Sequence, residues 1–268
     1  MFGIIPKPLW EKKIKPDELN RILMSLRVIY IETENKKILI DTGIGDYHSE
    51  KFKNQFDIQG LNSPLETILL NSHNVKADEI TDIIITHLHF DHVGGLGGGN
   101  NRLIFPNATI HLHKNHYQYA QAPTIRDSGS FQKHFFNPLL DQYLAKNKVQ
   151  FLNGDDGEII PDVVSFKTSF GHTPYMVHPI FDGHIYMADL VPMSHHVNIP
   201  WVMGYDIEPG VTTVYKEKFY QFIMDSNLKM IFEHDKDFFG ATLSIDEKGR
   251  YKCKRLFQAD DSHSMIID

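Results

Sequence analysis

The apolar positions of this chain fall mostly into short runs of the kind that form β-strands. "LRVIYI" at 26–31 and "ILI" at 38–40 are joined by the polar turn "ETENKK", which predicts a β-hairpin. "DIIIT" at 82–86 is a continuous apolar run, as expected for a strand that is buried on both faces. Comparable runs lie at 108–113, 149–152, 163–168, 184–190, 229–234 and 240–246, and "YKCKRLF" at 251–257 is also strand-like.

Helical spacing of apolar residues occurs in three segments between these strands. The first segment, 64–73, begins with Pro64, which suits the first helical position, and Ser63 is its predicted N-cap. Two further helices are predicted at 114–121 and 211–226. Strands therefore occur in both halves of the chain with helices between them.

This alternation predicts an α/β protein in which helices cover two sheets from outside. We expect one domain that spans residues 1–268. The segment 122–147 has no clear period and contains Pro, Gly, Ser and several aromatic residues. We interpret it as an insertion near the active face.

Composition and charge narrow the classes of partner. The chain has 268 residues, a formal net charge of −7 and 23% charged residues. This acidic balance disfavours a nucleic-acid partner, because such binding depends on neutralising phosphates with basic side chains. A small-molecule substrate is expected instead.

The chain also carries few signals of export or membrane insertion. Its single cysteine, Cys253, excludes an internal disulfide and fits a reduced compartment. The opening "MFGIIPKPLW" lacks the basic and apolar regions of a secretory signal, and no apolar run approaches the roughly 18 residues of a membrane span. We expect a cytoplasmic protein that does not bind membranes.

Candidate chemistry is concentrated in "HLHFDH", directly after the run at 82–86. If the chain stays extended there, His87 and His89 point to the same side, so that one ion can take both imidazoles. Asp91 and His92 follow where the chain must turn, and they are candidates for a second ion. Imidazole and carboxylate ligands suit Zn²⁺, Mn²⁺ or Fe²⁺ rather than a thiolate-type site.

Further ligands must come from distant parts of the sequence. "FGHTP" places His172 after a predicted strand, "YMADL" places Asp189 at the end of another, and "IFEHD" places His234 at the end of a third. Three such residues at strand ends predict a site at the rim of a sheet.

The set "THLHFDH", "GHT", "MADL" and "FEHD", in this order, resembles the metallo-β-lactamase-fold hydrolases. The resemblance implies a four-layer αββα sandwich with a dinuclear metal site along one edge. Two divalent ions are implied, most readily Zn, with Mn, Fe or Co as alternatives. It also implies that Asp41 of "LIDTG" supports the site without binding the metal, although a plain turn aspartate is the other interpretation.

The same resemblance assigns a role to each ligand. His87, His89 and His172 would bind the first metal, and Asp189 would bridge the two. The second metal would be bound by Asp91, His92 and His234.

Such a centre predicts hydrolysis by a metal-bridging hydroxide, with no side-chain nucleophile. One metal stabilises the developing oxyanion and the other receives the leaving alkoxide. Asp91 is the candidate catalytic residue, because a carboxylate there can pass the proton to the leaving group.

Within the family, the closest resemblance is to the quorum-quenching lactonase-like and organophosphate-hydrolase-like branch. Asp189 in place of a cysteine is unlike the subclass B1 β-lactamases, and His89 in place of a glutamate is unlike the flavodiiron oxidoreductases. The flanks "FGIIPKPLWEKK" and "ADLVPMSHHVNIPWVMGYD" are similar to those of the lactonases. A lactonase or esterase is expected, with a homodimer implied by the family.

Two alternatives stay open: a phosphotriesterase or phosphodiesterase of the same fold, and a metal-binding regulatory protein with vestigial hydrolysis. One mismatch bears on the choice, because Pro192 stands where the acyl-homoserine lactonases have a tyrosine that contacts the substrate carbonyl. Candidates for that contact are Tyr175, Tyr205, His195 and His196.

The remaining histidines and aromatic residues have simpler expected roles. We expect the histidines of "IHLHKNH" to be structural or to lie on the surface; they are His111, His113 and His116. Phe2, Trp10 and Trp201 suit either a pocket wall or the core.

Overall fold

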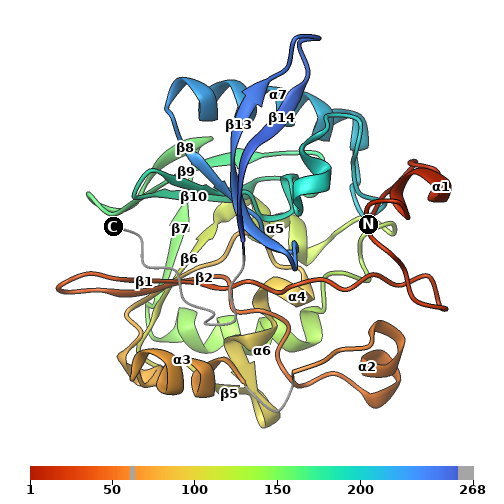
Figure 1. The fold of residues 1–268 in the computed structure, drawn as a ribbon. Helices are drawn as coiled ribbons and strands as arrows, with labels where there is room; N and C mark the ends of the chain where they lie inside the picture. Colours follow the sequence, from red (N-terminus) through yellow and green to blue (C-terminus); the bar gives the residue numbers. More distant parts are fainter. Residues whose placement is uncertain (61–63, 259–268) are drawn as a thin grey trace. The chain divides into compact units, whose positions relative to one another are not determined.

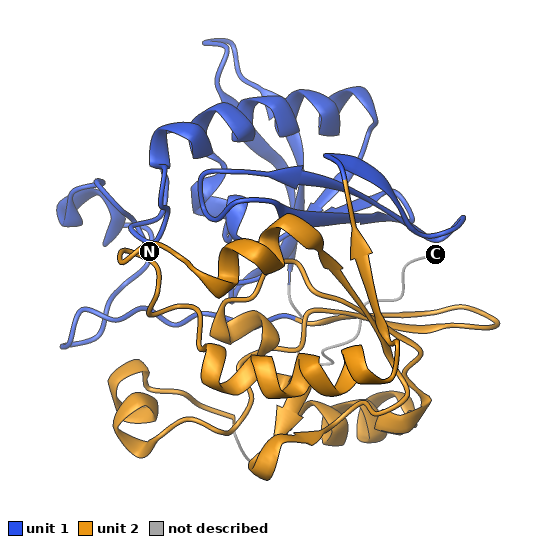
Figure 2. Ribbon diagram, turned by 180° about the vertical axis from the view of Figure 1, so that it is seen from behind, with its two compact units in different colours: residues 1–27, 154–268 blue, residues 28–153 orange. Residues whose placement is uncertain are grey.

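The computed structural model describes residues 1–60 and 64–258 of the chain (Figure 1). The chain forms two compact units, coloured separately in Figure 2. Unit 1 contains Met1–Arg27 and Gly154–Asp268, and unit 2 contains Val28–Asn153. Each unit is built on its own mixed sheet. That the whole chain is a single domain stays a prediction.

Unit 2 carries a five-stranded sheet in the order β1-β2-β3-β6-β7. The expected hairpin pairs β1 and β2 in antiparallel fashion, and each of the following neighbours is parallel. All three residues of β3 are buried, as the continuous apolar run predicts for a central parallel strand. The strands are β1 (Ile29–Glu32), β2 (Lys37–Ile40), β3 (Asp82–Ile84), β6 (Thr109–His113) and β7 (Val149–Leu152).

The helices of unit 2 follow the predicted apolar spacing in two cases. The predicted helices at 64–73 and 114–121 are confirmed as α3 and α5. The predicted start of the first was wrong by one residue, because α3 begins at Leu65 and Pro64 is its N-cap; Ser63 lies outside the described residues. A small ladder pairs β4 with β5. The remaining elements are α2 (Glu50–Phe56), α3 (Leu65–His73), α4 (Phe90–Val93), β4 (Gly97–Gly98), β5 (Arg102–Leu103), α5 (Lys114–Gln121) and α6 (Lys133–Ala145).

The segment 122–147 is more regular than its composition indicates. Half of it is α6, whose buried side chains fall at helical spacing: Phe135, Phe136, Leu139, Leu140 and Tyr143. Pro138 inside this helix obscures the pattern, because proline normally breaks a helix. The burial of one apolar face outweighs that local penalty.

Unit 1 carries a seven-stranded sheet in the order β14-β13-β12-β11-β10-β9-β8. Only β11 and β12 are parallel, and α7 (Pro209–Asp225) lies in the connection between them. Sequence analysis missed β8 and β10, and it also missed the short helices α1 (Lys7–Trp10) and α2. The strands are β8 (Asp156–Ile160), β9 (Val164–Ser169), β10 (Met176–Phe181), β11 (His184–Tyr186), β12 (Lys229–Ile231), β13 (Phe238–Ile245) and β14 (Tyr251–Gln258).

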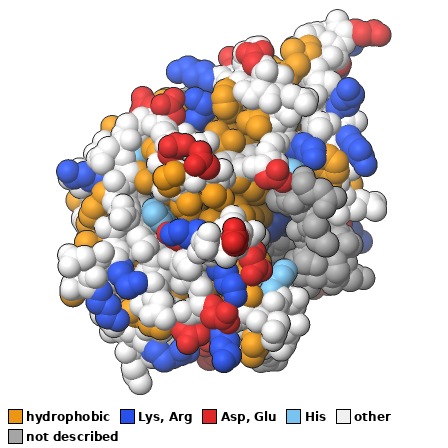
Figure 3. All heavy atoms as spheres, turned by 90° about the vertical axis from the view of Figure 1, so that its left-hand side faces the viewer, with side chains coloured by type: hydrophobic (Ala, Val, Ile, Leu, Met, Phe, Trp, Pro, Cys, Tyr) orange, Lys and Arg blue, Asp and Glu red, His pale blue; other side chains and the backbone are white. Residues whose placement is uncertain are grey.

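The helix predicted at 211–226 is confirmed as α7, which begins two residues earlier at Pro209. Proline fits this first position because its nitrogen has no hydrogen to donate. Within residues 1–60 and 64–258, none of the helices combines the length and apolar composition that a membrane crossing requires. Acidic and basic side chains are interspersed on the face drawn in Figure 3.

Candidate metal centre

In unit 2 the candidate ligands lie on the loop between β3 and α4. His87 follows the strand closely, His89 is the N-cap of α4, and His92 lies in its single turn. All three imidazoles are buried. Asp91 also lies in this turn and is partly accessible, with 19% of its side chain exposed.

One buried carboxylate holds this loop together. The backbone N–H of Thr86 donates to Oδ1 of Asp41 at 2.8 Å, and the Thr86 hydroxyl donates to Oδ2 at 2.7 Å. Nδ1 of His92 lies 2.9 Å from the same Oδ2. Because an ionised carboxylate only accepts, Nδ1 of His92 carries the proton and Nε2 presents the lone pair that a metal needs.

His87 and His89, at the start of the loop, each direct one ring nitrogen toward the other. Nδ1 of His87 lies 3.0 Å from the Thr86 hydroxyl oxygen, which accepts there because its own hydrogen goes to Asp41. Nε2 of His87 and Nδ1 of His89 are 3.1 Å apart. Two nitrogens bound to one tetrahedral Zn²⁺ lie about 3.3 Å apart. The spacing therefore fits two ligand atoms of a single ion.

In unit 1 the candidate ligands come from three strand ends. His172 follows β9, Asp189 follows β11, and His234 follows β12. The strands β9 and β11 run in the same direction because each is antiparallel to β10, and β11 is parallel to β12. All three residues therefore leave the sheet at the same edge.

The Asp189 carboxylate lies between the two imidazoles. Its Oδ2 is 3.1 Å from Nε2 of His172, and its Oδ1 is 3.0 Å from Nε2 of His234. A carboxylate that offers one oxygen toward each imidazole has the arrangement expected of a bridging ligand.

The Asp189 carboxylate and the neighbouring imidazoles shift one another's pKa values. Burial alone would raise the pKa of Asp189, but His234 and His172 outweigh it and hold that pKa well below its usual range. Burial lowers the pKa of His172, while Asp189 and Asp206 raise it to about 9. Without a metal the carboxylate thus favours a proton on His172, and a divalent cation can replace that proton.

His172 and His234 each have a second contact, at the ring nitrogen that faces away from Asp189. Nδ1 of His172 lies 3.0 Å from Oδ1 of Asp206, and Nδ1 of His234 lies 2.8 Å from the Ser25 carbonyl oxygen. Both contacts place the proton on Nδ1 and leave Nε2 facing Asp189. An acceptor on the distal nitrogen is typical of histidines that bind metal ions.

Sequence reasoning missed several of these supporting groups. Asp206 stands in "MGYD", which carries no motif, and Ser25 contributes only a backbone oxygen. Glu233 offers an oxygen within 4.8 Å of ligand atoms of Asp189 and His234. Its position directly before His234 in the sequence was the one signal that could have identified it as a candidate ligand.

Pro192 contributes through its backbone. The Pro192 carbonyl oxygen accepts a hydrogen bond from the His234 backbone N–H at 2.9 Å. Two of the residues considered for the missing tyrosine contact other groups: Tyr175 packs against the Phe170 ring, and His196 is stacked on Phe2. Tyr205 is 52% exposed.

The histidines of "IHLHKNH" and the aromatic residues near the N-terminus make structural contacts. Nε2 of His111 lies 2.8 Å from Asp82, Nδ1 of His113 accepts the Asn115 N–H, and Nε2 of His116 accepts the Leu88 N–H at 2.8 Å. Phe2 stacks on Trp10 and meets the edge of Trp201, and Phe2 and Trp10 are buried. The core interpretation therefore holds for Phe2 and Trp10.

Within each unit, the predicted ligands of that unit lie together. The loop at 87–92 gathers its ligands in unit 2, and three strand ends gather theirs in unit 1. The donor set fits a divalent ion in both, because each candidate histidine ligand presents a ring nitrogen toward another candidate ligand. Assignment of single residues to a first or second ion stays a prediction.

Comparison with known proteins gives matches along most of the chain. The sequence pattern of the metallo-beta-lactamase superfamily matches residues 27–234. The N-acyl homoserine lactonase of Bacillus cereus is 24% identical over 219 residues, which are 76% of this chain and 79% of that enzyme.

Two solved structures extend the comparison. A probable metal-dependent hydrolase from Staphylococcus aureus is 26% identical, with a TM-score of 0.83 over 99% of this chain and 92% of that one. AidC, a dizinc quorum-quenching lactonase in complex with a product, is 21% identical, with a TM-score of 0.68 over 88% of this chain and 80% of that one.

Proposed function

This chain belongs to the metallo-β-lactamase superfamily, and from that membership we propose that it is a metal-dependent lactonase, which opens the ring ester of a small molecule. The family and the fold class expected from the motifs are both confirmed. A metal-dependent hydrolase is the coarser statement that the family and the two ligand clusters support. Lactones as substrates are the finer part of the proposal.

The observation that carries the proposal is that the candidate histidine ligands are oriented for metal binding. In both His92 and His172, Nδ1 faces a buried carboxylate, so that Nε2 is available to bind a cation. We propose that the ligands of both units serve two divalent ions, as the family motif implies. His87, His89 and His172 would hold the first ion; Asp91, His92 and His234 would hold the second, with Asp189 shared.

When bound, such ions bring the pKa of water toward neutrality and polarise an electrophilic carbonyl. The chain itself then has two tasks. Asp41, Asp206 and the Ser25 carbonyl keep the imidazoles oriented. Asp91, the accessible carboxylate of the loop, would accept the proton of the attacking water and pass it to the leaving alkoxide. No serine or cysteine nucleophile is needed.

The choice of lactones over phosphotriesters rests on the relatives. The Bacillus cereus relative is an N-acyl homoserine lactonase, and AidC is a lactonase with N-hexanoyl-L-homoserine bound as its product. Both are distant, so the substrate is tested directly. Zn is the proposed metal, because the AidC centre is dizinc and the ligand set is His and Asp.

The test is elemental analysis combined with a hydrolysis panel. The panel holds γ-lactones of graded acyl length, an aryl ester, a phosphotriester and a phosphodiester, each with the protein as isolated and after chelation. We expect two divalent ions per chain, lactone hydrolysis as the fastest reaction, and loss of activity on chelation that added Zn²⁺ reverses.

Other results would overturn the proposal in distinct ways. Faster turnover of the phosphotriester would replace the lactonase with a phosphotriesterase of the same fold. A protein with both ions bound that leaves the whole panel untouched would instead be a regulatory or binding protein.

A further inference from the structure

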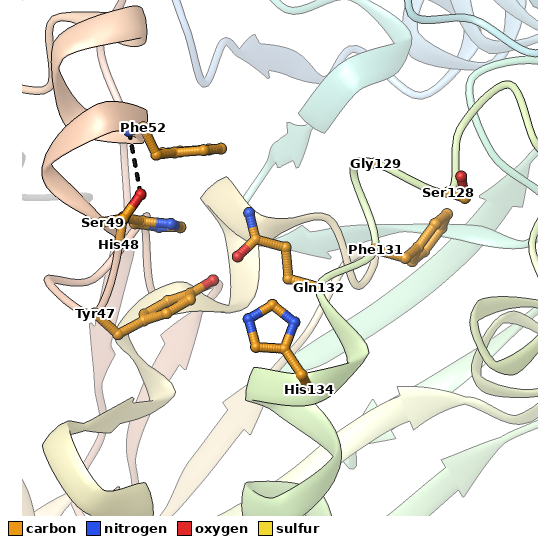
Figure 4. Close-up of a pocket in the computed structure, with 9 residues that line it drawn as sticks. All are labelled: Tyr47, His48, Ser49, Phe52, Ser128, Gly129, Phe131, Gln132 and His134. Carbon is orange, nitrogen blue, oxygen red and sulfur yellow. Dashed lines mark hydrogen bonds between the residues drawn. The ribbon is translucent and has the colours of Figure 1, made fainter.

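Unit 2 contains a pocket of about 550 Å³ beside the loop that carries its candidate ligands (Figure 4). This volume falls within the range of small-molecule sites in proteins. The lining residues come from the turn before α2, from α2, from the loop before α6 and from the first turn of α6: Tyr47, His48, Ser49, Phe52, Ser128, Gly129, Phe131, Gln132 and His134.

The aromatic walls of the pocket reach the candidate metal ligands. The Phe131 ring meets the His89 ring edge-on, with 4.6 Å between the centroids. Phe52 meets the edge of Phe90, the residue between His89 and Asp91, at 5.2 Å. A molecule in this pocket therefore lies next to the loop on which the reaction is proposed to occur.

The Tyr47 hydroxyl is the unusual polar group of the pocket. Its oxygen is buried and has no hydrogen-bond partner among the described residues. Tyr47 and Gln132 extend toward one another in Figure 4. A buried hydroxyl without a partner is rare in proteins, because leaving it unpaired costs free energy that a ligand oxygen can recover.

The Tyr47 side chain is held in this orientation. Its ring stacks on Phe135, with the planes 3° apart, and also contacts the His48 ring. Burial raises the pKa of Tyr47, and the nearby Asp91 charge raises it further. The hydroxyl thus keeps its proton at any ordinary pH and acts as a fixed hydrogen-bond donor.

We propose that the Tyr47 hydroxyl donates a hydrogen bond to an oxygen of the substrate's acyl group, and so selects lactones whose ring substituent carries a carbonyl. This inference rests on the proposed lactonase function. The acyl-homoserine lactonases have a substrate-contacting tyrosine at the position of Pro192. In this chain Tyr47 would supply a tyrosine contact from a different part of the sequence. A substrate with a plain alkyl substituent would pack against the aromatic walls but leave the Tyr47 hydroxyl unpaired. A site with a buried polar group disfavours such a substrate.

The test is the substitution Tyr47→Phe, assayed on two γ-lactones that match in length. One carries an acylamino group on the ring and the other an alkyl chain. Because a neutral hydrogen bond contributes a modest net free energy, we expect kcat/KM for the acylamino lactone to fall about 3- to 10-fold. We expect kcat/KM for the alkyl lactone to stay the same or rise.

Tyr117→Phe is the matched control, because Tyr117 lies in unit 2 but does not line the pocket. It should leave both substrates and their ratio unchanged. Metal content and the unfolding temperature are measured for both variants, so that a folding defect is recognised separately.

The outcomes separate the two proposals. If the wild-type protein hydrolyses both lactones and Tyr47→Phe changes them equally, the tyrosine is merely structural and this inference is wrong, while the lactonase proposal stands. If the wild-type protein hydrolyses neither lactone, the lactonase proposal fails and this inference fails with it.

Discussion

The two units gather their candidate ligands in opposite ways. Unit 2 places its ligands within six consecutive residues, from His87 to His92. Unit 1 brings His172, Asp189 and His234 from the ends of three strands of one sheet, in which β11 lies beside β12 and β10 separates β11 from β9. The first cluster is defined by a local loop, whereas the second exists only once the sheet has formed.

The two clusters also differ in how they are supported. In unit 2, Asp41 alone accepts from both the backbone and the hydroxyl of Thr86 and from His92. In unit 1 the supports are separate, since Asp206 holds His172 and the Ser25 carbonyl holds His234. Loss of a single supporting group should therefore damage unit 2 more broadly than unit 1. Asp189 is a separate case, because its carboxylate faces both imidazoles of unit 1.

Asp189→Asn should have the largest effect on metal binding and activity. An amide cannot offer an anionic oxygen to each of two neighbours, so the charge that holds the cluster is lost. We expect bound metal to fall below two ions per chain and kcat/KM to fall by at least about 100-fold, beyond the loss of a supporting contact. Elemental analysis and lactone assays measure both. Two bound ions with full turnover would contradict the bridging assignment.

Asp41→Asn and Asp206→Asn compare the two supports directly. Loss of such a contact typically weakens metal binding about 10- to 100-fold. Asn tolerates the left-handed conformation of residue 41, where φ is 59°, so the backbone should be retained. We expect Asp41→Asn to have the larger effect, because Asp41 holds the start and the end of the loop.

Zn²⁺ affinities measured by competition with a chelator decide this comparison. Asp246→Asn is a suitable control, because Asp246 lies in the turn after β13 and binds only its local neighbours. If Asp206→Asn weakens binding more than Asp41→Asn, the interpretation of Asp41 as the central support is wrong.

His116 gives a smaller test of the loop in unit 2. Its Nε2 accepts the Leu88 N–H, which lies between two ligands, and His116→Phe removes that acceptor. A buried N–H left unpaired costs about 1–3 kcal/mol, part of which should appear as a several-fold weaker affinity for metal. His111→Phe is the control, because His111 contacts Asp82 at the start of β3, whereas the ligand loop follows its end. Equal effects of the two variants would show that the Leu88 contact is unimportant.

The sequence predicts local features of this molecule better than distant ones. The loop cluster and Asp41 are recognisable because their residues stand in short motifs. Asp206 and Tyr47 carry no such signal, since their roles depend on which side chains the folded chain brings next to them. The strands β8 and β10 were missed for a related reason: exposed residues in β8 and Pro179 in β10 interrupt the apolar pattern.

The last comparison concerns stability rather than metal binding, and it uses a histidine of unit 1 that is not a candidate ligand. His178 is fully buried; its Nε2 lies 2.7 Å from the Ser169 hydroxyl, and its Nδ1 faces the Tyr186 carbonyl. Burial lowers the pKa of His178 from 6.5 to about 3. The folded protein therefore keeps this imidazole neutral where the unfolded chain protonates it.

The sign of the resulting pH dependence follows from proton uptake. Above pH 6.5 both states hold His178 neutral, so its stabilising contribution is complete. As the pH falls from 6.5 toward 3, only the unfolded chain binds the proton, and the free energy of unfolding decreases by up to about 1.4 kcal/mol per pH unit. Urea unfolding between pH 6.5 and about 5 measures this slope.

His178→Gln should reduce that slope, because glutamine can still bond to Ser169 but does not titrate. His73→Gln, which changes a partly exposed histidine at the end of α3, away from the pocket, should leave the slope as it is. Activity at neutral pH should change little in either variant, since neither residue is a candidate ligand. An unchanged slope in His178→Gln would mean that the acid sensitivity of the protein arises elsewhere, with the candidate ligands His172 and Asp189 as the next groups to examine.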